Sequence, residues 1–202
     1  MRGYAPPVSS NGTFGALLDA MKRAAAALRD HEIPFALAGS LAVYARGGPE
    51  TDHDVDFVLT PEAAEHALEV LAQSGFRCER PPEGWLYKVY DSNDAMIDLI
   101  FSPNGQDPAV VSEIVQRADE LEVYAITVRV MSATDVLASK LLALREHHVD
   151  YEPALEIARA LREQIEWDVL ADRTAGSPYA AAFFTLTQEL GLAPPATGAT
   201  RP

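Results

Sequence analysis

The chain of 202 residues contains a single cysteine, Cys78, so no internal disulfide can form. It also lacks a hydrophobic run long enough to span a bilayer, which argues against an integral membrane protein. The first residues lack the apolar stretch of a secretory signal peptide. Together these absences predict a cytoplasmic protein that makes no use of the membrane.

Basic residues are also scarce, since 16 Lys and Arg stand against 30 Asp and Glu, for a formal net charge of −14. An acidic protein repels the phosphate backbone of nucleic acids, which argues against broad, non-specific binding to them. The charge leaves room for a local basic patch, for Mg²⁺ bridging the protein to phosphates, and for docking with a basic protein partner. Hydrophobic residues make up 48% of the chain, enough for a proper core.

The hydrophobic periodicity predicts an α/β (α+β) protein with a mixed sheet flanked by helices, followed by a helical C-terminal lobe. We expect a catalytic lobe over 13–131, a helical lobe over 132–190, and flexible tails at 1–12 and 191–202. The strands are predicted at 35–38, 54–59, 76–80, 85–90 and 96–101, with an extended segment at 122–130. Helices are predicted at 13–31, 41–46, 61–73, 110–118, 133–146, 151–164, 166–172 and 178–190.

Two carboxylates stand at the start of the clearest strand, Asp54–Leu59. Asp54 and Asp56 are two residues apart, so strand alternation puts both on one face and the apolar residues on the other. Such a pair is a hard oxygen site of the kind that Mg²⁺ prefers, with substrate phosphate completing its shell. A register that pairs Asp52 with Asp54 is also open, but Phe57 continues directly into the strand core and favours Asp54 and Asp56.

Asp98 is the only charged residue of the otherwise apolar segment 96–101. A strand buried on both faces should not carry an unpaired carboxylate, so a metal ion or a neighbouring cation would explain it. The alternative is a strand at the sheet edge, with Asp98 facing water. As a third ligand or general base, Asp98 would prepare an attacking hydroxyl for displacement at phosphorus.

Gly39 and Ser40 follow a buried strand and open a helix, a geometry that binds phosphate through free N–H groups and a hydroxyl. Ser40 as a helix cap is compatible with this role, because both use the same position. Lys140 borders the apolar stripe of its helix. It either extends along the apolar surface to reach water or faces a phosphate, and we prefer the second interpretation.

Several other polar and aromatic residues have two interpretations. Arg46 either reaches a triphosphate or balances Glu50 and Asp52. Asp150 is well placed to cap the helix that begins at Tyr151. We expect Lys88 to be solvated, and the Trp and Tyr residues to belong to the core rather than to stacking surfaces.

The order of Gly39–Ser40, Asp54–Val55–Asp56 and Asp98 resembles the DNA polymerase β-type nucleotidyltransferase superfamily, over about residues 33–101. The stretches LAGSLA (37–42) and TDHDVDF (51–57) look most like its minimal members. These include the AbiEii/MenT-type toxins of bacterial toxin–antitoxin systems and the antibiotic nucleotidyltransferases. A looser resemblance extends to 139–145 and 150–151.

This resemblance implies a polymerase-β-like fold and the transfer of a nucleoside monophosphate from an NTP such as ATP to a hydroxyl, with two Mg²⁺ ions. By the same resemblance, Asp54, Asp56 and Asp98 are the catalytic metal ligands, and Gly39 and Ser40 hold the triphosphate. Lys140 and Asp150 join them in the nucleotide site.

The toxin-like group implies an RNA acceptor, a tRNA 3′ end, and a cognate antitoxin protein as partner. The alternatives are an aminoglycoside or lincosamide acceptor, a protein hydroxyl, or a non-catalytic nucleotide-binding module.

Overall fold

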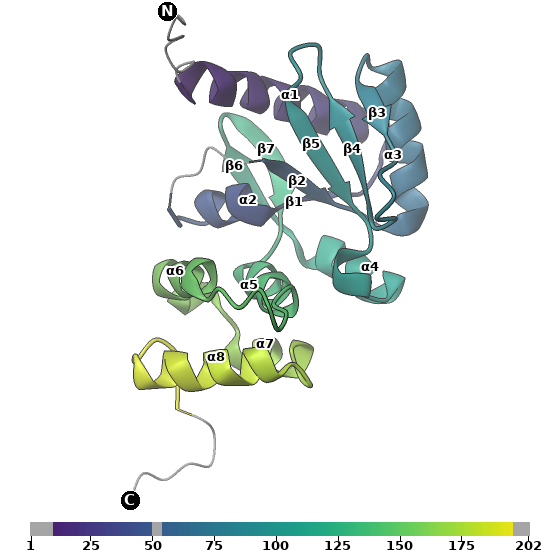
Figure 1. The fold of residues 1–202 in the computed structure, drawn as a ribbon. Coiled ribbons are helices and arrows are strands. Elements are labelled where there is room, and N and C mark those ends of the chain that lie inside the picture. Colours follow the sequence, from purple (N-terminus) through teal and green to yellow (C-terminus); the bar gives the residue numbers. More distant parts are fainter. Residues whose placement is uncertain (1–9, 50–53, 196–202) are drawn as a thin grey trace, which may run out of the picture.

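A mixed sheet of seven strands forms the centre of the N-terminal part of the molecule, in the order β3-β4-β5-β2-β1-β7-β6 (Figure 1). The computed structural model describes residues 10–49 and 54–195. Neighbouring strands run antiparallel except for β1 with β7 and β2 with β5, which are parallel. The strands are β1 (Ala36–Ala38), β2 (Val55–Val58), β3 (Arg77–Glu79), β4 (Leu86–Tyr90), β5 (Met96–Ile100), β6 (Asp119–Val123) and β7 (Ile126–Val130).

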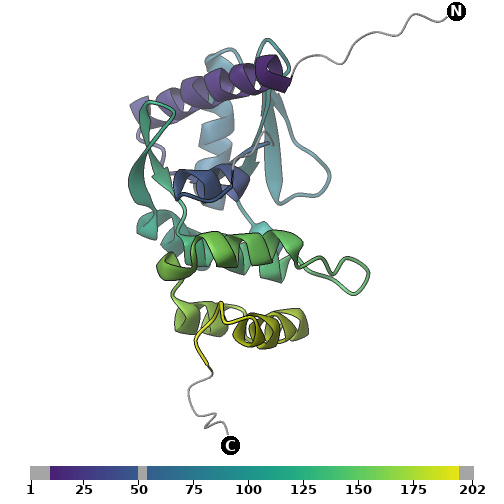
Figure 2. The ribbon, with the colours of Figure 1, turned by 90° about the vertical axis from the view of Figure 1, so that its left-hand side faces the viewer.

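Helices flank the sheet and then continue as a separate layer below it. The helices are α1 (Ser10–Asp30), α2 (Gly39–Ala45), α3 (Pro61–Gln73), α4 (Pro108–Arg117), α5 (Ala133–Leu142), α6 (Glu152–Ala160), α7 (Trp167–Arg173) and α8 (Pro178–Glu189). Figures 1 and 2 show α5 and α6 lying between the sheet and the outermost pair, α7 and α8. None of the helices within 10–49 and 54–195 is long and apolar enough to cross a membrane.

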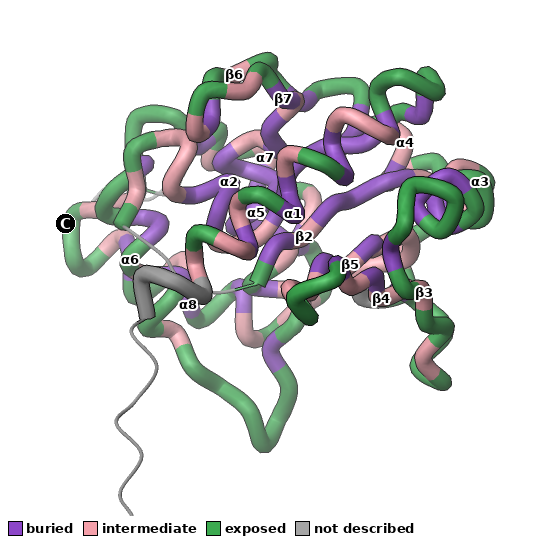
Figure 3. Tube along the Cα trace, turned by 90° about the horizontal axis from the view of Figure 1, so that it is seen from above, coloured by how far each residue is buried: buried purple, intermediate pink, exposed green. Residues whose placement is uncertain are grey.

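One continuous core joins the sheet to the helical layer. Leu37 of β1 and Phe57 of β2 belong to the same buried cluster as Leu137 of α5 and Phe183 of α8. Seen from above, the buried residues gather along the central strands, whereas β3 and the outer loops are largely exposed (Figure 3). The sheet and α5 therefore hold a fixed relation to each other, which matters for any site between them.

A buried ion-pair network reinforces this junction. Asp135 of α5 is 1% exposed and pairs with Arg117 of α4 and Arg173 of α7. Its carboxylate also accepts a hydrogen bond of 2.7 Å from the Ser132 hydroxyl, which caps α5. A buried carboxylate needs such partners because an unpaired charge in the interior is strongly unfavourable.

Most of the predicted elements are confirmed, including the α/β class and the hairpin of β4 and β5. The helix at 61–73 has the predicted bounds because Pro61 occupies its first turn and the Thr60 hydroxyl accepts a hydrogen bond from the Ala63 amide. Helix α1 begins at Ser10, three residues before the predicted start. The remainder of the predicted tails, 1–9 and 196–202, and the alternative ligand Asp52 lie outside the described residues.

The single extended segment predicted at 122–130 is wrong, because the chain forms a hairpin of β6 and β7 there. The turn residues, Tyr124 and Ala125, have φ angles of 49° and 64° and carry no glycine to mark the turn. Tertiary contacts accompany this conformation, since the Tyr124 ring stacks on Tyr44 at 5.4 Å and meets Phe14 edge-on at 5.8 Å.

Candidate active site

Three charged residues form a row across the middle of the sheet. Asp56 of β2 lies opposite Asp98 of β5, and Asp98 lies opposite Lys88 of β4. Directly opposed residues of neighbouring strands point to the same face, so these side chains share one face of the sheet. Asp54 immediately precedes β2 and is exposed at the same end.

Gly39 brings the backbone at the start of α2 against the Asp56 carboxylate. Its φ of +60° is a left-handed conformation that glycine adopts easily. A Cβ atom built on Gly39 would overlap Oδ2 of Asp56. Only a glycine therefore permits this close approach between the helix start and the carboxylate.

The surroundings of Asp56 make its charged form unfavourable. Burial is the largest cause, and the nearby carboxylates of Asp98 and Asp54 add to it, so the pKa of Asp56 rises from 3.8 to about 6. The positive charges of Lys140 and Lys88 act in the opposite direction. Asp56 is thus the centre of a concentrated negative charge that a cation would relieve.

Asp98 is paired with Lys88, contrary to the expectation that this lysine is solvated. The Lys88 Nζ lies 2.9 Å from Oδ1 and 3.2 Å from Oδ2 of Asp98, and the two side chains are only 26% and 14% exposed. Since β5 lies inside the sheet, the alternative of an edge strand facing water is also wrong. The charge on this apolar strand has a neighbouring cation, which is one of the two explanations that the sequence offered.

A cleft of about 790 Å³ lies between this face of the sheet and α5. Gly39 and Asp56 line it from the sheet side and Lys140 from α5, so the structure brings these predicted site residues together. Lys140 is exposed at the cleft, and its charge acts on Asp56. Ser40 follows Gly39 in α2 and is half-buried.

Arg46 does not turn toward this cleft. Its Nε donates to the carbonyl of Met131 at 2.7 Å, and its Nη2 bonds the carbonyl of Val130 at 2.9 Å and pairs with Asp119 at 2.7 Å. The side chain is 8% exposed. These contacts tie the end of α2 to β6 and β7, a structural role in place of the predicted nucleotide contact.

Replacing Arg46 by Met is therefore expected to lower the free energy of unfolding by about 1–3 kcal/mol, because buried carbonyl groups lose their donor. The KM for the NTP that the sequence predicts as substrate should stay unchanged. Thermal unfolding and steady-state kinetics measure the two quantities, with Arg29→Met as control because Arg29 is 67% exposed. A raised KM at unchanged stability would restore the nucleotide-binding role.

Asp150 forms a turn just before α6. Its Oδ1 accepts a hydrogen bond of 2.9 Å from the amide of Glu152, the first residue of α6. Asp150 is exposed and is not among the described residues that line the cleft. This contact is an Asx turn just before α6, whose N-cap is Tyr151 and makes no side-chain capping hydrogen bond, so the capping role expected of Asp150 is wrong.

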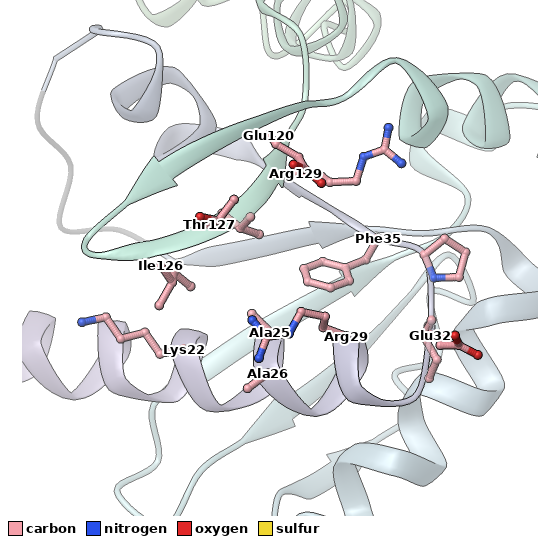
Figure 4. Close-up of a pocket in the computed structure, with 13 residues that line it drawn as sticks. Lys22, Ala25, Ala26, Arg29, Glu32, Phe35, Glu120, Ile126, Thr127 and Arg129 are labelled. Atoms are coloured by element: carbon pink, nitrogen blue, oxygen red, sulfur yellow. The ribbon is translucent and has the colours of Figure 1, made fainter.

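A second hollow, of about 300 Å³, lies between α1 and β7. Figure 4 shows the Phe35 ring pointing into it, with Lys22 and Arg29 extending from α1. Arg129 on the other wall already bonds the carbonyls of Gln116 and Ala118. None of the predicted site residues is among those seen to line this hollow, so the cleft at Asp56 remains the candidate active site.

Within the described ranges, no group of three or more His, Cys, Asp and Glu side chains is close enough to hold a metal ion together. The ligand types in and beside the cleft nevertheless suit a hard divalent cation, since Asp56 and its neighbours Asp54 and Asp98 supply carboxylate oxygens only. The pKa of Asp56 is raised first by burial and then by the other two carboxylates, and a bound cation would favour its charged form.

Comparison with known proteins gives a family and a fold. A family model described as "Nucleotidyl transferase of unknown function" (DUF2204) matches residues 17–179. A solution structure of the antibiotic-resistance factor ANT(2″)-Ia is 12% identical, covers 86% of this chain and 96% of that chain, and has a TM-score of 0.54. A crystal structure of ANT(2″)-Ia in complex with adenylyl-2″-tobramycin is 14% identical, covers 82% and 98%, and has a TM-score of 0.58.

At these identities the two solved structures support the fold alone. A search of curated protein sequences gave no match.

Proposed function

The chain belongs to the DUF2204 family of nucleotidyl transferases, and we propose that its cleft at Asp56 moves a nucleoside monophosphate from an NTP to an acceptor hydroxyl. The observation that carries this proposal is the placement of Asp56. It stands opposite Asp98, against the backbone of Gly39, and across the cleft from Lys140. An acid, a close backbone approach and a cation thus meet in one hollow, with Asp98 beside the acid on the neighbouring strand, as transfer at a phosphate requires.

Asp54, Asp56 and Asp98 are the residues that would hold the divalent cation, for which we propose Mg²⁺ and, by resemblance, two ions. When bound, Mg²⁺ supplies charge that neutralises the phosphate oxygens. The fit of these residues rests on their all-oxygen chemistry and on the accumulated negative charge around Asp56.

The remaining residues have distinct roles in the proposed transfer. Gly39 and Ser40 present the start of α2 to the triphosphate, and Gly39 allows the approach because it has no side chain. Lys140 offsets the charge that develops on the leaving pyrophosphate. The acceptor oxygen forms a bond to the α-phosphorus, the bond from that phosphorus to the β-bridging oxygen breaks, and the acceptor proton passes to Asp98.

For the acceptor we propose the 3′ end of an RNA, with tRNA as the first candidate and an antitoxin protein as partner. This rests on the likeness of residues 37–42 and 51–57 to the toxin-like group. An aminoglycoside is the second candidate. Two observations favour it: the fold is shared with ANT(2″)-Ia in complex with adenylyl-2″-tobramycin, and a chain of net charge −14 attracts a cationic acceptor better than an RNA.

The test offers labelled NTPs with Mg²⁺ to total RNA, to a panel of aminoglycosides and lincosamides, and to protein lysate. Label on RNA supports the first candidate, and label on a drug supports the second. Because the attacking group must be a hydroxyl, periodate-oxidised RNA, which has lost its terminal diol, should accept no label. Absence of both transfer and pyrophosphate release with every NTP would contradict the proposed function.

A further inference from the structure

Trp85 is an exposed aromatic residue in the wall of the active-site cleft. It is 39% exposed, whereas most large hydrophobic side chains of the described residues are buried. It is the only aromatic residue among the described residues that line the cleft. This position differs from the core location that the sequence suggested, and exposing so large an apolar surface is unfavourable unless something covers it.

The backbone of Trp85 is anchored even though its side chain is exposed. The Trp85 carbonyl accepts hydrogen bonds of 3.1 Å from the amides of Phe101 and Ser102, at the end of β5. The next residue, Leu86, pairs with Ile100 in the sheet. The backbone of Trp85 is therefore held at a defined place in the wall of the cleft.

The cleft runs from the charged row toward Trp85. Val58 and Ile100, two residues beyond Asp56 and Asp98 on the same strand face, form its floor between these ends. Trp85 lies two strands away from Asp56 and three residues further along the sheet. By standard strand geometry, their Cα atoms are therefore roughly 14 Å apart. A nucleotide whose phosphates lie at Asp56 and Lys140 has its base at the Trp85 end.

The acceptor is less well placed to occupy this end. Asp54 and Asp98, the acids that would meet the attacking hydroxyl, are not among the described residues that line the cleft. The hollow extends from Asp56 toward Val58, in the direction away from Asp54. It accommodates the part of the substrates that does not carry the attacking hydroxyl, which is the nucleoside of the NTP.

We propose that Trp85 is the surface on which the nucleobase of the NTP stacks, which makes it a binding residue for the nucleotide. The inference rests on the proposed function of the cleft. Stacking on an indole stabilises any base, because every base has a π-face, and it is strong enough to matter for affinity. Trp85 therefore contributes to NTP affinity and leaves the rate of the chemical step largely unchanged.

The chain offers a matched control, because its only other tryptophan is Trp167 at the start of α7. Trp167 is half-buried against Phe184, with ring centroids 6.4 Å apart, and does not line the cleft. The variants Trp167→Phe and Trp85→Phe thus each retain one fluorophore, inside and outside the cleft. In the presence of Mg²⁺, each variant is titrated separately with two ligands. One is an ATP analogue that has a methylene bridge between its α- and β-phosphates, and the other is inorganic tripolyphosphate, which has no base.

Fluorescence of the Trp167→Phe protein should fall and saturate with the ATP analogue and stay constant with tripolyphosphate. The Trp85→Phe protein should show no change with either. In steady-state kinetics, Trp85→Ala should raise the KM for NTP about ten-fold with little change in kcat. The thermal unfolding curve of each variant checks that the substitution leaves the fold intact.

Quenching by tripolyphosphate alone, or a Trp85→Ala protein with unchanged KM for NTP, would overturn the proposal. These outcomes differ from failure of the proposed function, in which the wild-type protein itself neither binds nor turns over an NTP.

Discussion

An Asp56→Asn variant is expected to lose NTP turnover by about 1,000-fold or more while remaining folded. Asp56 lies opposite Asp98 and against Gly39 and lines the cleft, so its charge acts on any cation or phosphate bound there. The amide has the same shape but no charge, which removes the electrostatic contribution without leaving a hole. Pyrophosphate release with each NTP measures the loss.

The control is Asp30→Asn, the same chemical change at a side chain that is 66% exposed at the end of α1. Its turnover should equal that of the wild type. An Asp56→Asn protein that keeps its turnover would remove Asp56 from the active site and contradict the proposed function of the cleft.

The same variant should change how stability depends on pH when no divalent metal is present. The pKa of Asp56 is raised to about 6 in the folded state by burial and neighbouring carboxylates, so between pH 4 and 6 the folded protein holds a proton that the unfolded chain releases. The wild type therefore loses stability relative to Asp56→Asn as the pH rises through this window. The difference should reach up to about 2 kcal/mol, with allowance for partial exposure.

Thermal unfolding of both proteins in a chelating buffer, from pH 4 to 8, measures this difference. It should grow until about one pH unit above the folded-state pKa of about 6 and remain constant beyond that, since Asp56 is then ionised in both states. Adding Mg²⁺ at pH 7.5 should restore stability to the wild type and not to Asp56→Asn. A difference that is independent of pH would mean that Asp56 is not held in a region of excess negative charge.

A Gly39→Ala variant is expected to lose about 100-fold in turnover and about 2–4 kcal/mol in the free energy of unfolding. Two costs combine at this residue. Alanine is strained at a φ of +60°, and its Cβ would overlap the Asp56 carboxylate, so either α2 or Asp56 must move. A displacement of this carboxylate misplaces the group on which the proposed chemistry depends.

A Gly47→Ala variant separates the effect of backbone strain from that of the contact with Asp56. Gly47 has a φ of +93° at the end of α2, and a Cβ atom added there would meet nothing within 4 Å. Gly47→Ala should therefore lose only about 1–2 kcal/mol of stability through backbone strain and keep its turnover. Equal turnover losses in the two variants would show that strain in α2, and not the contact with Asp56, is responsible.

Much of the fold was accessible from the sequence because it depends on local patterns. Alternation in Asp54–Leu59 and capping at Thr60 and Pro61 predicted β2 and α3, and the turn at 91–94 predicted the hairpin of β4 and β5. The hairpin of β6 and β7 was missed because Tyr124 and Ala125 form its turn without a glycine. Contacts of Tyr124 with Tyr44 and Phe14 accompany that turn, and such contacts have no signature in a local pattern.

The residues of the candidate site likewise include some that the sequence predicted and others that only the structure placed. Residue type and order along the chain singled out Gly39, Asp56 and Lys140, which the structure brings to one cleft. Lys88, Arg46 and Trp85 were each assigned a different place by the sequence. The partners of the first two, Asp98 and Asp119, are 10 and 73 residues away along the chain. The first pair depends on the exact register of the hairpin of β4 and β5, and no short-range pattern predicts a pair at the separation of the second.

The sequence by itself determined which strand face carries Asp54 and Asp56, because side chains alternate along a strand whatever surrounds it. It also determined that a glycine, Gly39, opens the helix that precedes this strand, since the residue type is read directly. Only the tertiary structure decided that Lys88 neutralises Asp98, that Arg46 is committed to β6 and β7, and that Trp85 lines the cleft. These features depend on strand order, on register between strands, and on the packing of α5 over the sheet, which arise only when distant segments meet.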